Sequence, residues 1–278
     1  MTDRWYVVVP VKPLPVAKSR LRADVPAWLH HQLVRALVLD SVEAVLACPL
    51  VAATVVVTAD AELAEAVTRL GARVCPDPGG GLNAAVTAAA EQIGPAHPVA
   101  VLTGDLPAVR PEEIAAALHA AATSPDAASF VPDAAGTGTT MLAAPPGVPL
   151  PPRFGVDSAA AHAAAGARRL TGDWPGLRRD VDTAADLVAA TGYGLGRRTR
   201  RLWPVGATVP GMQGTVAEFD PDTQTGALLL DDGRRQRFEA AAFAASGLRL
   251  LRLGQRVQVE YAPDGTIQRI AVPTMRGY

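Results

Sequence analysis

The sequence predicts an α/β fold, a three-layer domain with a mostly parallel sheet, followed by a small C-terminal all-β barrel. Stretches typical of strands and helices alternate over the first two thirds of the chain, whereas the last third holds short strand patterns separated by turn sequences. Hydrophobic residues make up 49% of the 278 residues but aromatic residues only 5%, as expected for a core of Ala, Val and Leu. This length exceeds one typical domain. We therefore expect a first domain over 1–196, a basic and proline-containing linker over 197–210 and a second domain over 211–278.

The elements of the first domain follow from the spacing of its apolar residues. Short β-branched stretches predict strands, and apolar residues three and four positions apart predict helices. In chain order we expect a strand at 7–11, a helix at 26–46, a strand at 54–58, a helix at 60–70, a strand at 72–75, a helix at 84–93, a strand at 99–102 and a helix from Pro111. Further on, we expect a helix at 159–165, a strand at 177–181 and a helix at 183–190.

The strand Val99–Leu102 is the central one of this series. Its four apolar residues predict a strand buried on both faces, and the chain then turns through Gly104 to Asp105. In open α/β sheets the ligand binds outside the carboxyl ends of the strands. Asp105 is therefore placed where a metal-bound phosphate would lie, although an acid that caps the next helix would explain these residues equally well.

Other charged residues follow strands of the same sheet. Lys12, Lys18 and Arg20 lie in the proline-containing loop after the first strand and could neutralise a triphosphate and its departing pyrophosphate, the alternative being a solvated loop. Mg²⁺ prefers one or two carboxylates together with phosphates and water. Asp180 is the better second ligand and Asp182 the runner-up, because Asp182 precedes a helix that it could cap.

A glycine-rich loop follows the third strand. Gly79, Gly80 and Gly81 let backbone amides approach a base or a phosphate, and Asn83, after Leu82, could pair with a base edge. A triple glycine alone is weak evidence, and its weight comes from facing the same crevice as the acids.

Small hydroxyl residues and open backbone amides occur in the later part of the first domain. Thr139, Thr140, Gly155 and Ser158 are suited to the phosphate and carboxylate of a small second substrate. Ser158 could equally cap the helix that follows it.

Several classes of function are excluded by what the sequence lacks. The net charge of −1 argues against a general affinity for nucleic acid, and neither a P-loop nor a GxSxG motif is present. Cys48 and Cys75 have no metal-ligand spacing and are expected to be buried thiols, a single disulfide being the alternative. The five histidines form no metal motif, and we assign them no role. With no signal-like or membrane-length apolar run, we expect a cytoplasmic protein that binds no membrane. Metal-assisted transfer of a nucleotidyl group is the chemistry that remains.

Seven segments in order carry a resemblance to a known family. They are Val9–Lys12, Ala17–Leu21, Pro76–Asp77, Gly81–Asn83, Asp105–Pro107, Phe154–Gly155 with Ser158, and Asp180–Thr183. As an ordered set over residues 4–195, they resemble the 2-phospho-L-lactate guanylyltransferase family, also called phosphoenolpyruvate guanylyltransferase.

The resemblance implies a fold, a reaction and a set of site residues. The fold would be that of the molybdenum-cofactor guanylyltransferases. The reaction would be Mg²⁺-dependent transfer of GMP from GTP to phosphoenolpyruvate or 2-phospho-L-lactate, releasing pyrophosphate, in coenzyme F420 biosynthesis. Asp105 and Asp180 would hold the metal, Lys12, Lys18 and Arg20 would face the GTP phosphates, Gly80, Gly81, Leu82 and Asn83 would lie at the nucleotide, and Thr140, Gly155 and Ser158 would hold the three-carbon acid.

Four questions stay open on the sequence alone. The acceptor could also be 3-phosphoglycerate, because the small chemical differences among these three-carbon acids change the binding free energy in a pocket only slightly. The same fold would also suit a sugar or molybdopterin nucleotidyltransferase. A nucleic-acid-binding or regulatory protein that senses a nucleotide is the hypothesis from another class, and the oligomeric state is not predicted.

The second domain resembles a cold-shock OB-fold in two segments, Gln213–Phe219 and Gly247–Val257. Only Phe219 and Phe238 are near enough in the sequence to stack on bases, and acidic and basic residues are equal in number from Trp203 to the C-terminus. We therefore expect a barrel used for packing or regulation rather than for nucleic acid.

Overall fold

The computed structural model describes residues 4–12, 18–25, 27–203, 213–230, 233, 235–261 and 266–272. The chain forms two compact units, each made of several segments. The first consists of Met1–Ala17, His31–Val181 and Tyr193–Leu202, and the second of Lys18–His30, Asp182–Gly192 and Trp203–Tyr278. No helix in the described ranges is long and apolar enough to cross a membrane.

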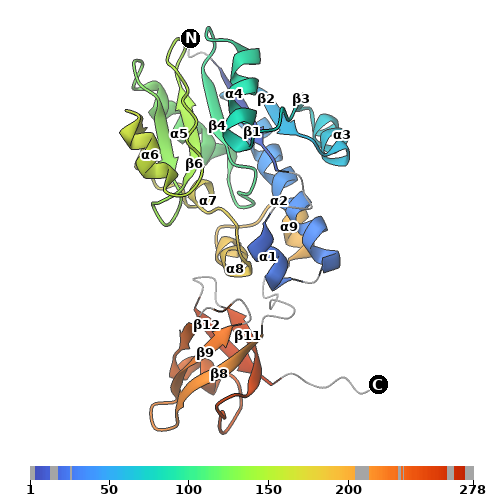
Figure 1. Cartoon of the computed structure of the whole chain (residues 1–278), viewed down its shortest axis with the longest axis vertical. Coiled ribbons are helices and arrows are strands. Elements are labelled where there is room, and N and C mark those ends of the chain that lie inside the picture. Colours follow the sequence, from blue (N-terminus) through green and yellow to red (C-terminus); the bar gives the residue numbers. More distant parts are fainter. Residues whose placement is uncertain are drawn as a thin grey trace. The chain divides into compact units, whose positions relative to one another are not determined.

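A seven-stranded sheet organises the first unit (Figure 1). Its strands are β1 (Trp5–Pro10), β2 (Val51–Thr58), β3 (Arg73–Pro76), β4 (Val99–Leu102), β5 (Ser129–Pro132), β6 (Thr139–Ala144) and β7 (Arg168–Arg169), in the spatial order β3-β2-β1-β4-β6-β5-β7. Among these strands β6 alone runs antiparallel to its neighbours, β4 and β5. The mostly parallel sheet is therefore confirmed, and β4 lies at its centre with all four residues buried.

Helices cover both faces of this sheet, as Figure 1 shows for α4 in front of it and α5 behind it. The first unit holds most of α2 (Ala27–Ala47) and all of α3 (Ala61–Leu70), α4 (Leu82–Ile93), α5 (Pro111–Ala122), α6 (Ser158–Ala164), α7 (Pro175–Arg178) and α9 (Arg197–Leu202). On one face, Val86 of α4 and Ala159 of α6 share a core cluster with Val8 and Val101. Val9, whose side chain points to the opposite face, is equally buried. A sheet buried on both faces explains why its strands are almost continuously apolar.

Three local expectations were wrong. The stretch predicted as a strand at 177–181 contains the end of helix α7, which begins at Pro175 because proline suits the first helical position. Helix α8 (Ala184–Thr191) is capped by Thr183, whose hydroxyl pairs with Asp186 in a capping box, and not by Asp182. The basic run predicted as a solvated linker instead forms α9.

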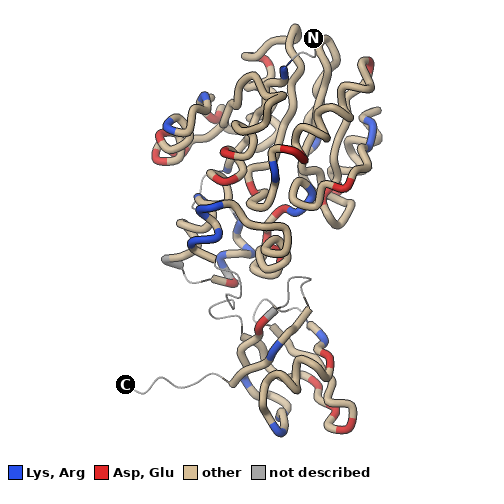
Figure 2. The backbone as a smooth tube through the Cα atoms, turned by 180° about the vertical axis from the view of Figure 1, so that it is seen from behind, with Lys and Arg blue, Asp and Glu red and all other residues tan. Residues whose placement is uncertain are grey.

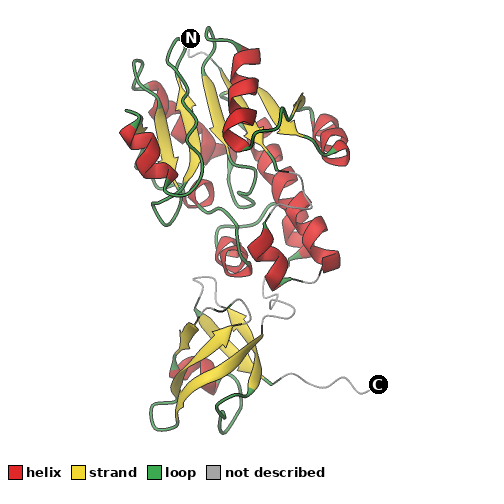
Figure 3. Ribbon diagram, in the orientation of Figure 1, coloured by secondary structure: helices red, strands yellow, loops and turns green. Residues whose placement is uncertain are grey.

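The second unit contains an antiparallel five-stranded sheet, shown in yellow in the lower half of Figure 3. The strands are β8 (Gln213–Asp220), β9 (Thr225–Leu230), β10 (Arg235–Phe238), β11 (Arg256–Tyr261) and β12 (Ile267–Ala271), in the order β10-β9-β8-β11-β12. The short strands expected in this part of the chain are present, and the sheet is consistent with a small barrel-like domain. The domain boundaries stay a prediction.

The aromatic residues of this sheet pack against one another. Helix α10 (Ala240–Ala244), which the sequence did not predict, contributes Phe243, whose ring lies 4.8 Å from that of Phe219. Phe219 also stacks on Phe238 at 6.3 Å. Both rings that could have stacked on bases thus pack in one aromatic cluster, in which Phe238 is buried and Phe219 is half-buried. Figure 2 shows acidic and basic residues interspersed along these strands.

The second unit also contains α1 (Ser19–Asp24) and α8. The Asp24 carboxylate, which is buried, accepts a hydrogen bond from the backbone N–H of Ala184 at 2.9 Å. The first turn of α8 is thereby joined to the last turn of α1, and this contact fixes the segment that follows Asp182.

Helix α9 is held in the first unit by Asp40 of α2. The buried Asp40 carboxylate accepts from the backbone N–H groups of Arg198, at 3.1 Å, and Thr199, at 2.7 Å. The Arg198 guanidinium adds contacts to Asp40 at 3.3 Å and to Glu43 at 2.5 Å. Asp40 thus satisfies the free N–H groups at the start of a helix distant in sequence.

We expect Asp40→Ala to destabilise the protein by about 3 kcal/mol, because two buried N–H groups and a guanidinium lose their acceptor. Glu43→Gln is the matched control and should cost less than about 1 kcal/mol, since its carboxylate is half exposed. Urea denaturation of both variants measures this. Equal shifts of the two midpoints would show that Asp40 does not cap α9.

Candidate active site

The turn after β4 is held on both sides of Asp105. The N–H of Thr103 donates to the Thr140 carbonyl at 3.0 Å, and the N–H of Leu106 donates to the Ser41 hydroxyl at the same distance. A Cβ on Gly104 would stand 3.3 Å from the Val11 side chain, so the turn packs closely on the sheet. The N-cap of α5 is Arg110. Asp105 therefore does not cap the next helix, and this alternative is excluded.

A second acidic segment lies against this turn. The backbone N–H of Val181 donates to the backbone carbonyl of Asp105 at 3.1 Å. Within the first unit, one carboxylate oxygen of Asp105 lies within 4.8 Å of one of Asp180. Clustered carboxylate oxygens are the ligands that hard divalent cations take, so the donor set fits a metal ion.

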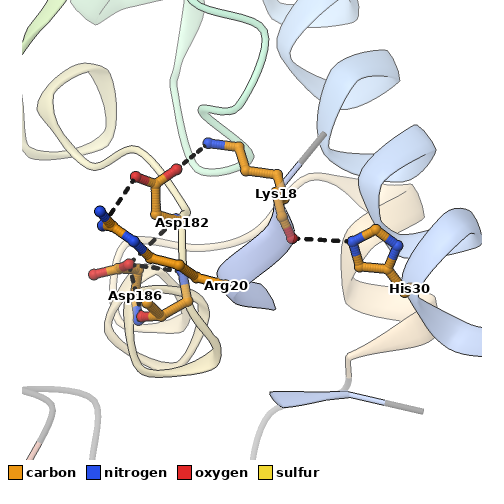
Figure 4. Close-up of polar contacts among 6 residues, drawn as sticks. Lys18, Arg20, His30, Asp182 and Asp186 are labelled. Carbon is orange, nitrogen blue, oxygen red and sulfur yellow. Dashed lines mark hydrogen bonds and ion pairs between the residues drawn. The ribbon is translucent and has the colours of Figure 1, made fainter. Parts of the chain in front are cut away.

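Asp182 forms ion pairs with two basic side chains, which Figure 4 shows. Lys18 Nζ lies 2.5 Å from Asp182 Oδ1, and Arg20 Nη1 lies 3.8 Å from Oδ2. Lys18 precedes α1 in the left-handed conformation, with φ at 54°, and its carbonyl bonds His30 Nε2 at 3.2 Å. Asp182 is therefore an ion-pair partner of two of the predicted phosphate-binding cations.

The predicted phosphate-binding cations Lys12 and Arg20 lie in different kinds of structure. Lys12 is exposed just after β1, as expected for a loop cation. Residues 13–17 of the predicted loop lie outside the described residues. Arg20 is on helix α1 rather than in a loop, and its side chain is 76% exposed. The sequence did not predict this helix, because its few apolar residues follow two prolines.

The glycine-rich loop leads directly into α4. Gly79, Gly80 and Gly81 all have positive φ, at 79°, 81° and 87°, a conformation that only glycine adopts without strain. In the first turn of α4, the Asn83 amide donates to the Phe154 carbonyl at 3.1 Å and accepts from the Phe154 N–H at 2.8 Å. The predicted nucleotide loop is thus fastened to the segment that contains Gly155. A contact from Asn83 or Leu82 to guanine stays a prediction.

The three predicted acceptor residues occupy distinct positions around that segment. Thr140 is buried on β6, with its hydroxyl 3.5 Å from the Val131 carbonyl. Gly155 is exposed, with φ at 143°, which disfavours any side chain. Ser158 is the first residue of α6 and is buried. The N-cap of that helix is Asp157, so the alternative that Ser158 serves as a cap is wrong.

His162 is a residue that the sequence analysis missed. It is fully buried on α6, where its ring contacts Thr139 and the backbone of Arg153. Burial is the main cause that lowers the pKa of His162 from the usual 6.5, the Arg153 charge adds to it, and a backbone contact of Ser158 opposes it. The signal available in the sequence was its spacing of one helical turn after Ser158.

The fold and this site define a class of protein. Residues 19–181 match the model of the MobA-like NTP transferase domain. A putative nucleotide-diphospho-sugar transferase from Desulfovibrio desulfuricans G20 has the same fold, with a TM-score of 0.58 at 18% identity over 72% of this chain and 94% of that one. The class is therefore that of the nucleotidyltransferases.

The sequence comparison narrows this class to one family. A phosphoenolpyruvate guanylyltransferase of Salinispora arenicola is 58% identical over 212 residues, which are 76% of this chain and 99% of that protein. One from Geodermatophilus obscurus is 53% identical over 71% of this chain and 93% of its own length. The chain belongs to the phosphoenolpyruvate guanylyltransferase family, as the resemblance in its motifs implied.

We expect Asn83→Ala to loosen the segment around Gly155. The variant leaves the N–H and carbonyl of the buried Phe154 without partners, which should cost about 1–3 kcal/mol. Hydrogen exchange of the Phe154 amide should accelerate at least about 10-fold, because that cost falls on the local structure. Thr87→Val is the control, since the exposed Thr87 hydroxyl bonds only the Asn83 carbonyl. Unchanged exchange in Asn83→Ala would contradict this role of Asn83.

Proposed function

We propose that this protein transfers GMP from GTP to the phosphate of phosphoenolpyruvate and releases pyrophosphate, a step of coenzyme F420 biosynthesis. The observation that carries the proposal is the placement of Asp105 and Asp180 side by side at the carboxyl edge of the sheet. The family relatives named for this activity support the choice of donor and acceptor.

The reaction needs alignment and charge neutralisation more than proton transfer. An anionic oxygen of the acceptor phosphate attacks the α-phosphorus, the new P–O bond forms, and the bond to the bridging oxygen of the β-phosphate breaks. Because the attacking phosphate is already ionised, Asp105 serves as a metal ligand and not as a general base. Mg²⁺ held by Asp105 and Asp180 would supply a positive charge at the α-phosphate.

The remaining predicted residues divide between donor and acceptor. Lys12, Lys18 and Arg20 are proposed to neutralise the triphosphate, and the positive-φ glycines Gly80 and Gly81 to admit the nucleotide, with Leu82 and Asn83 near guanine. Thr140, Gly155 and Ser158 are proposed to bind the three-carbon acid through hydroxyl and N–H donors. Hydroxyl and N–H donors of this kind suit an anion.

The expected activity is pyrophosphate release from GTP in the presence of Mg²⁺ and phosphoenolpyruvate. A coupled pyrophosphate assay with phosphoenolpyruvate, 2-phospho-L-lactate and 3-phosphoglycerate offered separately measures it. We expect Asp105→Asn to lower kcat at least about 100-fold, since metal coordination stabilises the transition state by several kcal/mol. Asp126→Asn, in an exposed loop after α5, is the control. Absence of pyrophosphate with all three acids would refute the proposal.

Asp180 and Asp182 should differ in how much each contributes to metal binding. We expect Asp180→Asn to weaken Mn²⁺ binding at least about 10-fold and Asp182→Asn to weaken it less, because Lys18 already neutralises Asp182. Calorimetric titration of Mn²⁺ into the unliganded protein measures both. The reverse order would make Asp182 the second metal ligand.

A further inference from the structure

His162 contacts two separate segments through its two ring nitrogens. Nε2 accepts a hydrogen bond from the backbone N–H of Arg153 at 3.0 Å, and Nδ1 lies 3.0 Å from the Thr139 hydroxyl. A backbone N–H can only donate, so Nε2 carries no proton. The neutral ring therefore keeps its proton on Nδ1, the nitrogen that faces the Thr139 hydroxyl.

The packing around the ring leaves it no other position. His162 is 0% exposed, and its ring lies 5.2 Å edge-on from Phe154 and 5.9 Å from Phe130 of β5. Phe154 is in turn held by both amide atoms of Asn83. The histidine is thus one member of a partly buried polar network that links Thr139, Arg153 and, through Phe154, Asn83.

Each of the three predicted acceptor residues lies close in the sequence to a member of this network. Thr140 follows Thr139 on β6, Gly155 lies two residues after Arg153, and Ser158 lies one helical turn before His162 on the same face of α6. Three segments that are separate in the sequence therefore meet at a single imidazole.

We propose that His162 is a positioning residue for the acceptor, which sets the main chain at Gly155 against Thr140 and Ser158. The inference rests on the proposed function, because it takes these three residues as the acceptor pocket. Both ring nitrogens are engaged and the ring is buried, so His162 neither transfers a proton nor touches the reacting atoms. Displacing one wall of a pocket by even an ångström weakens ligand binding strongly.

The experiment compares side chains that preserve one ring nitrogen at a time. The Gln amide oxygen can replace Nε2 as the acceptor for Arg153, whereas Asn reaches only the position of Nδ1. We expect His162→Asn to raise the KM for phosphoenolpyruvate at least about 10-fold and to leave the KM for GTP within about twofold, while His162→Gln stays closer to the wild type. His119→Gln, on the exposed face of α5, is the matched control.

Thr139→Val provides a second test that leaves the histidine in place. It removes the hydroxyl partner of Nδ1 with little change of shape, and should raise the KM for phosphoenolpyruvate less than His162→Asn does. Circular dichroism and thermal melting identify any variant that fails to fold. If folded His162→Asn and Thr139→Val both keep the wild-type KM for the acceptor, the positioning role is refuted.

The pH dependence gives a readout that a purely structural residue would not share. Protonation would place an N–H at Nε2 opposite the N–H of Arg153, so the acceptor KM of the wild type should rise as the pH falls below the pKa of His162. Burial and the Arg153 charge hold that pKa below 6.5. The ratio of the acceptor KM to that of His162→Gln at each pH cancels the ionisation of the substrate. A ratio independent of pH would contradict the proposal.

Failure of the proposed function can be told apart from failure of this inference. If the wild type turns over none of the three acids, the guanylyl transfer is refuted, and hydrogen exchange of the Arg153 amide then decides on His162. Faster exchange in His162→Asn, with His162→Gln protected, supports the fixed loop. Equal exchange in the three proteins refutes it.

Discussion

The candidate site depends on one backbone hydrogen bond, from the N–H of Val181 to the carbonyl of Asp105. Asp105 is placed by the central strand β4, but Asp180 lies on no strand of the sheet, so no ladder fixes it there. The bond to Asp105 and the fully buried Val181 side chain hold this segment at the sheet edge instead. Two carboxylates on either side of such an anchor repel each other, and a bound cation removes that repulsion. The placement of these two acids thus fits a bound divalent cation.

The proposed metal site and the proposed acceptor site have different electrostatic requirements. The acids at Asp105 and Asp180 need positive charge before an anionic phosphate can approach. The proposed acceptor residues Thr140, Gly155 and Ser158 are uncharged, and the burial of His162 favours its neutral form. A charged His162 would lose the contact to the Arg153 N–H. The proposed metal site and the proposed acceptor site therefore differ in the charge of the residues that build them.

Much of the fold could be predicted from the sequence because parallel strands buried on both faces leave a clear apolar pattern. The strand before Asp105 is the best example, since all four residues are buried as expected. The prediction of a strand at 177–181 was wrong because a short apolar run does not distinguish a strand from a helix turn. The helix start at Trp174-Pro175 was overlooked. Helix α1 was not predicted because its few apolar residues follow two prolines, and in the structure Asp24 at its end bonds the N–H of Ala184.

The topology of the sheet allowed only part of the candidate site to be predicted from the sequence. Parallel strands send their carboxyl ends to one edge, so residues such as Asp105 are found by inspecting the positions just after each strand. His162 follows no strand and belongs to no motif, and a single histidine on an apolar helix face is more often part of the core. Its importance arises from a coincidence in space, where the N–H of Arg153 and the hydroxyl of Thr139 reach the same ring. Residues that follow a strand at the sheet edge can therefore be predicted from a sequence. Residues such as His162, which position other segments, are recognised only in the folded chain.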